Sequence, residues 1–159
     1  MEEYEYSMKV KSIKPYIAYC EKNKYKLESV TKQNRIVYEN NYSKDIIARI
    51  TTTIIQGKKT CVFDCKNVST RAKALKISTE SIPMKVTKGN RQSIESMLNT
   101  LNFYEAANNT RKRYVYNKKG VKFEIDDYIS PAMCVVGIEG KKDEVDKVYK
   151  EIKEIENDK

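Results

Sequence analysis

Polar and apolar residues alternate from the start of the chain. Between Glu3 and Lys11 the odd positions hold charged residues or serine, and the even positions hold tyrosine, methionine or valine. A period of two is typical of a β-strand with one packed face and one polar face. We therefore predict a strand here, with all of its charged side chains on one side.

Seven further segments show the same alternation, or a run of β-branched residues bounded by turn residues, and they are predicted to be strands. They are residues 35–40, 46–56, 60–66, 70–77, 111–116, 121–128 and 134–140. Turns at residues 57–59 and 117–120 are expected to join two pairs of these strands as hairpins. The pattern predicts an antiparallel, strand-dominated domain.

Three helices are predicted between and after the strands. Ser12 can cap the first, which has Pro15 near its first turn. The second begins at Asn90, and the third spans residues 143–157. Their inward apolar positions are Tyr16, Ile17 and Cys20, then Ile94, Met97, Leu98 and Leu101, then Val145, Val148, Tyr149, Ile152 and Ile155.

Acidic and basic side chains share the polar faces of the predicted strands. These positions are Glu3, Glu5, Ser7, Lys9, Lys11, Arg49, Asp64, Lys66, Arg111, Arg113, Lys122, Glu124, Asp126 and Glu139. An open sheet would turn such a face to water. A sheet closed with its charged face inward would instead form a tunnel, with the helices packed outside. The alternation alone leaves both arrangements open, and both belong to the α+β class.

Composition narrows the chemistry that such a face can perform. The chain has 159 residues, and its 31 lysines and arginines against 22 acidic residues give a net charge of +9. That length suits one domain over residues 1–159. The absence of histidine excludes Ser/His/Asp triads and histidine metal sites. In a tunnel, arginine and lysine would bind an anionic chain, and clustered carboxylates would hold Mg²⁺ or Mn²⁺.

The cysteines and the lengths of the apolar runs indicate a protein of a reducing compartment. The four cysteines, Cys20, Cys61, Cys65 and Cys134, lack the close pairing of zinc ligands, so we expect packed free thiols. No apolar run approaches the roughly 20 residues of a membrane helix, and the first residues are charged, unlike a signal peptide. We expect a cytoplasmic protein without a membrane partner.

Three stretches, taken in their order along the chain, resemble one known family. YEYSMKVK at residues 4–11 resembles the ExExK strand of the CYTH, or triphosphate tunnel, superfamily. SMLNTLNFYEA at residues 96–106 resembles the helix before the second half of that tunnel. RKRYVY, GVKFEIDDY and VVGIEG, between residues 111 and 140, resemble its last three strands. The resemblance implies a closed antiparallel β-barrel with helices outside.

The resemblance also implies roles for individual residues. It assigns substrate binding to Lys9, Lys11, Arg35, Arg49, Lys66, Arg111, Arg113 and Lys122. It assigns metal binding to Glu3, Glu5, Glu124 and Glu139, and catalysis to Glu5 and Asp126. Two departures concern the metal site. Ser7 replaces an acidic residue if Glu5 and Lys9 are aligned with ExExK, whereas a shift by two residues keeps both acids and loses the lysine. Gly137 stands where the family usually has a glutamate.

Three functions follow as hypotheses. The first is a phosphohydrolase or adenylyl cyclase that acts on a triphosphate-containing small molecule or nucleotide with Mg²⁺ or Mn²⁺. The second is a tunnel that binds a nucleotide or polyphosphate without chemistry, which the changes at Ser7 and Gly137 favour. The third is an RNA-binding module that uses the basic surface and the 12 tyrosines, although no RNA-binding signature is present.

Overall fold

The computed structural model describes residues 2–157, which form nine β-strands and three α-helices. The strands are β1 (Glu2–Val10), β2 (Lys26–Asn40), β3 (Ile46–Ile55), β4 (Lys58–Ala72), β5 (Leu75–Glu80), β6 (Met84–Lys85), β7 (Phe103–Lys118), β8 (Val121–Ser130) and β9 (Met133–Glu139). The helices are α1 (Lys14–Lys22), α2 (Arg91–Thr100) and α3 (Lys142–Asn157). No helix within this range is long and apolar enough to cross a membrane.

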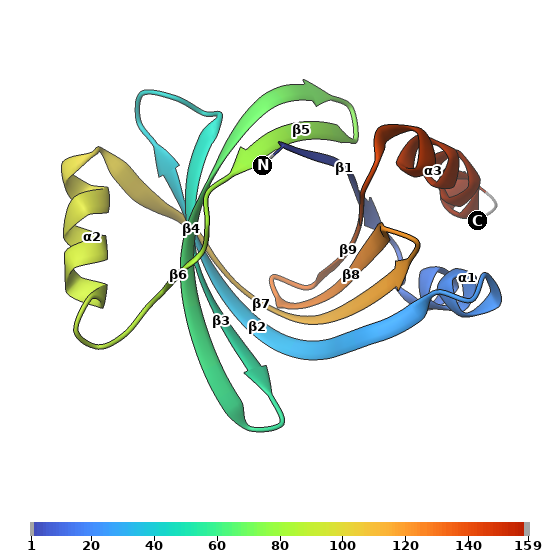
Figure 1. The fold of residues 1–159 in the computed structure, drawn as a ribbon, viewed down its shortest axis with the longest axis horizontal. Coiled ribbons are helices and arrows are strands. Elements are labelled where there is room, and N and C mark those ends of the chain that lie inside the picture. Colours follow the sequence, from blue (N-terminus) through green and yellow to red (C-terminus); the bar gives the residue numbers. More distant parts are fainter. Residues whose placement is uncertain (1, 158–159) are drawn as a thin grey trace.

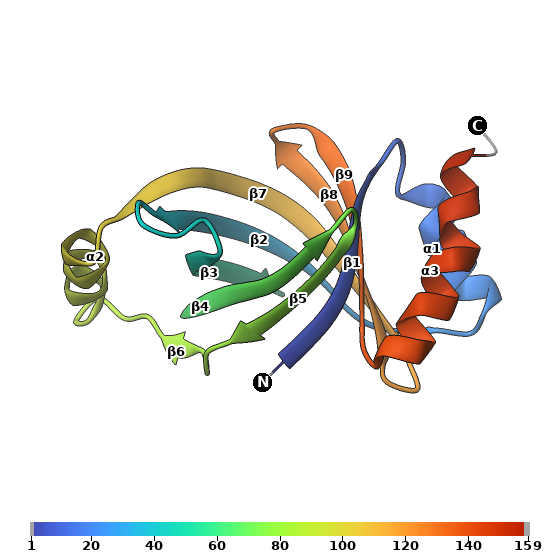
Figure 2. The same cartoon turned by 90° about the horizontal axis from the view of Figure 1, so that it is seen from above.

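Eight of the strands close into an antiparallel barrel. Their order is β3-β2-β7-β8-β9-β1-β5-β4, and pairing of β3 with β4 completes the ring, while the two-residue β6 extends from β4. Figure 1 looks into this ring, and Figure 2 shows it from above. The closed alternative is therefore confirmed, and the α+β class with it.

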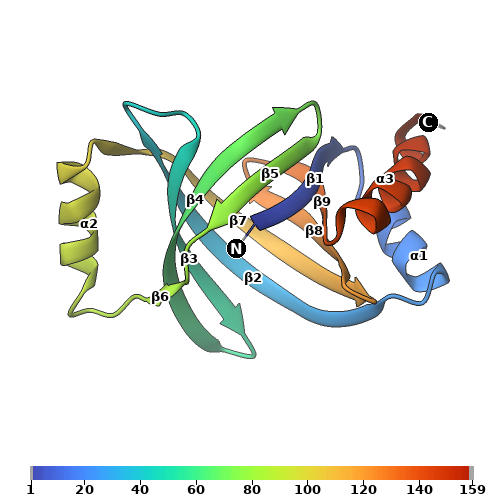
Figure 3. The same cartoon turned by 45° about the horizontal axis from the view of Figure 1, so that its top comes forward.

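The helices pack on the outside of the barrel, as expected. In Figure 3, α1 and α3 lie together at one end, against the outer face of the β1, β8 and β9 wall, whereas α2 lies at the other end. Fully buried Phe123, Ile125 and Val136 point outward from the strands into the core with α1 and α3. Each such side chain contributes about 1.5–3 kcal/mol when buried. Since the apolar faces of these strands pack against the helices outside the barrel, their charged faces point inward and line the interior.

Several strand limits differ from the prediction. The strands β2 and β7 begin at Lys26 and Phe103, well before residues 35 and 111, because each pairs with the other along nearly its whole length. The prediction of one strand over residues 70–77 is wrong. There β4 runs on to Ala72, and a turn with Lys73 at a positive φ of 55° leads into β5. No Gly, Pro, Asn or Asp residue stands between residues 70 and 77, so the sequence does not mark this turn.

The prediction for the second helix is wrong in part. Ile94 and Leu98 are buried against Ala48 and Ile50, but Met97 and Leu101 are 51% and 61% exposed. The buried stripe of α2 is narrow because the helix packs on the barrel along only one side. In α1, by contrast, Tyr16 and Cys20 are fully buried as expected. All four cysteines, which lie within the described residues, are free thiols.

Candidate functional site

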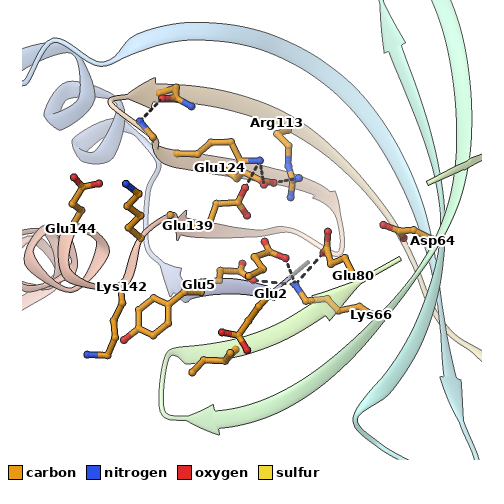
Figure 4. A pocket seen from close by; sticks show the side chains of 18 of the residues that line it. Glu2, Glu5, Asp64, Lys66, Glu80, Arg113, Glu124, Glu139, Lys142 and Glu144 are labelled. Carbon is orange, nitrogen blue, oxygen red and sulfur yellow. Dashed lines mark hydrogen bonds and ion pairs between the residues drawn. The ribbon is translucent and has the colours of Figure 1, made fainter. Parts of the chain in front are cut away.

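The interior of the barrel holds two cavities that share part of their lining. The larger has a volume of about 960 Å³ and the smaller about 230 Å³. Six residues line both: Glu5, Arg35, Arg49, Lys66, Arg113 and Glu124. The cavities therefore meet at a charged middle section. Figure 4 shows the larger one from close by.

Four arginines on three adjacent strands form one wall of this interior, which we call the arginine wall. They are Arg35 on β2, Arg49 on β3, and Arg111 and Arg113 on β7. The pairing of β2 with both neighbours places them together, since Arg35 lies opposite Thr51 on β3 and Asn109 on β7. Three of them are anchored by partners. Arg49 binds both oxygens of Asp64, at 2.8 and 2.5 Å, and Arg113 binds both oxygens of Asp126, at 2.7 and 2.8 Å.

Arg111 is anchored by neutral groups. It donates two hydrogen bonds to Gln33 Oε1, at 3.0 and 2.8 Å, and one to the Tyr128 hydroxyl, at 2.9 Å. Only 3% of its surface is exposed. Burial and the neighbouring Arg113 lower the pKa of Arg111, while Asp126 at 3.6 Å offsets part of that effect. Its charge is thus only partly compensated within the protein.

Arg35 is the least compensated cation of the wall. Its Nε donates to Thr51 Oγ1 at 3.0 Å, and no ion pair joins it to a carboxylate of residues 2–157. Burial and the charges of Arg111, Arg49 and Arg113 lower the pKa of Arg35 well below its usual range. Its side chain is partly exposed to the tunnel, and a guanidinium held here favours an anion as its partner, because a charge withdrawn from water without a counter-charge is costly.

Carboxylates on β1, β5 and β9 gather on the opposite side, and we call Glu3, Glu5, Glu80 and Glu139 the carboxylate cluster. Register explains the gathering, because Glu5 lies opposite Glu139 on β9. Lys66 from β4 reaches into the cluster. Its ammonium nitrogen lies 3.3 Å from oxygens of Glu3 and Glu5 and 3.5 Å from one of Glu80. Figure 4 labels Lys66, Glu5 and Glu80 and marks ion pairs between the side chains drawn as dashed lines.

The cluster holds a proton at neutral pH. Burial and a hydrogen bond to Glu139 raise the pKa of Glu3 to about 9, so this carboxyl is neutral at pH 7. Burial would also raise the pKa of Glu80, but Arg49 outweighs it and lowers that pKa to about 2. Glu139 also has a lowered pKa, because hydrogen bonds from Glu3 and Lys122 and the charge of Lys122 outweigh its burial. One proton, Lys66, Lys122 and Arg49 thus offset the charge of the four carboxyl groups.

Comparison with protein families and with curated proteins found no match to the sequence. Solved structures do match. PH1012 from Pyrococcus horikoshii has a TM-score of 0.73 and 16% identity, over 94% of this chain and 87% of that one. HpAC1 from Hippeastrum, described as a candidate adenylyl cyclase with a dominant triphosphatase activity, has a TM-score of 0.65 and 13% identity, over 94% and 84%. The chain has the triphosphate tunnel fold.

This fold occurs in more than one setting. The Mediator head module from Schizosaccharomyces pombe contains a chain that matches with a TM-score of 0.63 and 10% identity, over 89% of this chain and 83% of that one. At such identities the tunnel fold is what the comparisons establish. The chemistry of this tunnel has to be argued from its own residues.

The tunnel has the carboxylate oxygens that a divalent cation prefers, but these oxygens are not arranged around an empty cation site. Oxygen ligands from several carboxylates suit Mg²⁺ or Mn²⁺. Gly137 leaves room for one of them, since a Cβ there would meet Glu5 Oε1 at 3.2 Å. Within residues 2–157, however, no group of three or more acidic or cysteine side chains is arranged to hold a metal ion. The donor set fits a cation, whereas its present arrangement is built around Lys66.

Most of the substrate-binding residues expected from the sequence meet in the tunnel. Arg35, Arg49, Lys66, Arg111, Arg113 and Lys122 line it. Lys9 does not join them: it is exposed near the end of β1 and lines neither cavity. Lys11 follows the last residue of β1 and is also exposed. Both lie beyond the middle section because the cavities reach along β1 only as far as Ser7.

The expected acidic residues line the tunnel too, with distinct surroundings. Glu124 pairs with Arg113 and with Lys122, and Glu139 also pairs with Lys122. Asp126 is 3% exposed, and both of its oxygens are held by Arg113. It is therefore placed to fix the guanidinium rather than to exchange a proton. The catalytic role expected for Asp126 stays a prediction.

Sequence reasoning missed two residues of the site, Glu80 and Gln33. Glu80, which joins Arg49 at 2.9 Å to Lys66, was not singled out because the limits of β5 were misplaced. The signal was present, since Lys76, Ser78 and Glu80 alternate with apolar or small residues. Gln33, which orients Arg111, was missed because the first half of β2 was not predicted.

Proposed function

We propose that this chain binds a triphosphate group in its tunnel and hydrolyses it with the help of a divalent cation. The observation that carries the proposal is Arg35, a partly buried cation that has no acidic partner among residues 2–157 and lies beside three other arginines. The fold it shares with HpAC1, whose description names a triphosphatase activity, agrees with this choice. An anion with several charged oxygens would compensate the arginine wall, which single small anions could do only in part.

Each side of the tunnel has its own task in this proposal. The arginine wall binds non-bridging phosphate oxygens and stabilises the charge that develops on them as a phosphate leaves. Asp64 and Asp126 hold Arg49 and Arg113 in place before substrate arrives. The carboxylate cluster would hold Mg²⁺ or Mn²⁺, which would supply further charge neutralisation. Glu5 lies beside Gly137 and is our candidate to orient the attacking water.

A second function, binding without turnover, is favoured by the departures at two positions. Ser7 and Gly137 lie opposite each other in the pairing of β1 with β9, and neither can supply a negative charge. If the remaining carboxylates cannot hold a cation, the arginine wall would still bind a nucleotide or polyphosphate. An adenylyl cyclase would direct the ribose 3′-hydroxyl at the α-phosphate and release pyrophosphate, whereas a triphosphatase would direct water at the terminal phosphate and release phosphate, so product analysis must separate the two.

The test is a product and phosphate-release assay on ATP, thiamine triphosphate, tripolyphosphate and a triphosphate RNA end, with Mg²⁺ and with Mn²⁺. We expect phosphate release from at least one of them, and we expect Glu5→Ala to abolish it. Calorimetry of the same variant without metal should show triphosphate binding nearly unchanged or tighter, because a like charge leaves the anion site. Binding without any product would favour the second function. No binding at low salt would contradict both.

A further inference from the structure

Lys66 occupies the space that a cation bound by the carboxylate cluster would need. Its side chain comes from β4, is 8% exposed, and is directed at carboxylates from two other strands. The ammonium group contacts Glu3, Glu5 and Glu80 at nearly equal distances of 3.3–3.5 Å. It thus sits among the oxygens rather than to one side of them. A Mg²⁺ ion would have to draw the same oxygens in to about 2.1 Å.

A second observation shows that this group of residues has unused binding capacity. Ser78 is 1% exposed, and its Oγ has no hydrogen-bond partner within residues 2–157. It lies directly opposite Glu3 in the pairing of β1 with β5, so both side chains point to the same face. Buried hydroxyl groups are rarely left unpaired. Ser78 therefore supplies one more oxygen donor beside Glu3, with unused capacity for a ligand that replaces Lys66.

Lys66 has an alternative partner close by when the tunnel is loaded. Arg49 and Lys66 both contact Glu80 Oε1, at 2.9 and 3.5 Å, so Lys66 lies where the carboxylate cluster meets the arginine wall. Arg35, Arg49 and Lys66 line both cavities. A phosphate bound by the arginines would come within reach of the ammonium group and would compete with the carboxylates for it.

We propose that Lys66 is the resident counter-ion of the carboxylate cluster, and that it must move to a bound phosphate before a divalent cation can enter. The proposal rests on the proposed function for the phosphate, but its metal half stands by itself. It makes metal binding and phosphate binding mutually reinforcing, since each favours the position of Lys66 that the other needs. It also means that the protein without substrate does not bind the cation tightly.

The first test measures binding of Mn²⁺ alone, with no phosphate present, by calorimetry and by the paramagnetic resonance signal of free Mn²⁺. We expect Lys66→Met to bind Mn²⁺ at least about tenfold more tightly than the wild type, because an ammonium no longer competes for the oxygens. Lys9→Met is the matched control, since Lys9 also lies on a barrel strand but lines neither cavity and forms no ion pair among residues 2–157. It should bind Mn²⁺ as the wild type does. Equal affinity in the wild type and Lys66→Met would overturn the proposal.

A second measurement uses the wild type, in case Lys66→Met does not fold. Nitrogen-15 resonances of the lysine ammonium groups are recorded without metal, and the signal missing in Lys66→Arg is assigned to Lys66. Tripolyphosphate alone should shift that signal. If calorimetry shows bound tripolyphosphate and the signal stays in place, Lys66 does not move and the inference fails. If tripolyphosphate does not bind, the proposed function fails, while the Mn²⁺ comparison still decides the role of Lys66.

Discussion

At the scale of single residues, a substitution at Arg35 is expected to weaken triphosphate binding without destabilising the fold. Its charge is disfavoured by burial and by three neighbouring arginines. Arg35→Met should therefore lower triphosphate affinity by about 1.5–3 kcal/mol, the usual contribution of a charge-assisted hydrogen bond. The free energy of unfolding should not fall, because no ion pair is lost. Calorimetry with tripolyphosphate and urea unfolding measure the two effects.

Arg113→Met is the matched control for this variant. It removes the same charge from the same wall, but it takes both hydrogen bonds from Asp126 and one ion pair from Glu124, which keep only the weaker contacts with Arg111 and Lys122. Breaking a buried ion pair from one side costs about 3–5 kcal/mol, so this variant should lose stability as well as affinity. Equal stability losses in both variants would contradict the view that Arg35 is held ready for an external anion.

Glu3 is expected to make stability depend on pH. Its pKa of about 9 in the folded protein lies above the value of 4.5 for a free side chain. Since the folded state binds this proton more tightly, the stabilisation is complete below pH 4.5 and is lost as the pH rises through about 9. Glu3→Gln keeps the shape and removes the titration. Its melting temperature relative to the wild type should rise between pH 5 and pH 9, and a constant difference would show that Glu3 does not hold the proton.

At the scale of elements, the two faces of α2 are expected to contribute unequally to the stability of the protein. Leu98 is 4% exposed and packs against the barrel, whereas the adjacent Met97 is 51% exposed. Leu98→Ala should destabilise the protein by about 2–5 kcal/mol, the usual cost of a large-to-small change in a core. Met97→Ala should change stability by no more than about 0.5 kcal/mol. Urea unfolding of both variants checks this, and similar losses would mean that another surface covers Met97.

The same elements show what the sequence could and could not predict. The strict alternation of β1 and β8 predicted which side chains line the tunnel, because a period of two leaves no other choice once one face is packed. The start of β2 could not be predicted. Residues 26–34 are mostly polar and become a strand through pairing with β7, including a bulge between Leu27 and Ser29. The turn at residues 57–59 predicted the pairing of β3 with β4, but closure of the barrel also depends on pairing of β2 with β7 and of β1 with β9, which no local pattern encodes.

The site shows the same division. Shared parity on successive strands brought Arg49, Arg111 and Arg113 together correctly. Parity does not say how far along the barrel axis a residue lies, and so Lys9 was expected inside although it lies beyond the cavities. The partners that neutralise each charge also escaped prediction. Among residues 2–157 Arg35 has no acidic partner while Arg49 has two, and this difference follows from register and side-chain reach, which only the folded chain fixes.

At the scale of the whole molecule, charge is distributed unevenly along the tunnel. The larger cavity is lined by equal numbers of acidic and basic side chains, eight of each. The smaller is lined by seven basic side chains and three acidic ones. Because an enclosed lining of one sign concentrates the potential, the smaller cavity should attract the phosphates most strongly. A triphosphate is therefore expected to extend from the middle section toward the smaller cavity, with any organic group toward the larger one.

Two lysines at opposite ends of the tunnel test this orientation. Lys76 lines only the smaller cavity, and Lys119 lines only the larger one. If the phosphates extend toward the smaller cavity, Lys76→Ala should lower tripolyphosphate affinity by roughly threefold to tenfold at low salt, the range for a partly exposed charge contact. Lys119→Ala removes the same charge and should have a smaller effect. Calorimetry in 20 and 200 mM salt should show the Lys76 effect shrinking, because salt screens partly exposed charges. A larger loss in Lys119→Ala than in Lys76→Ala would reverse the orientation and place the phosphates at the larger mouth.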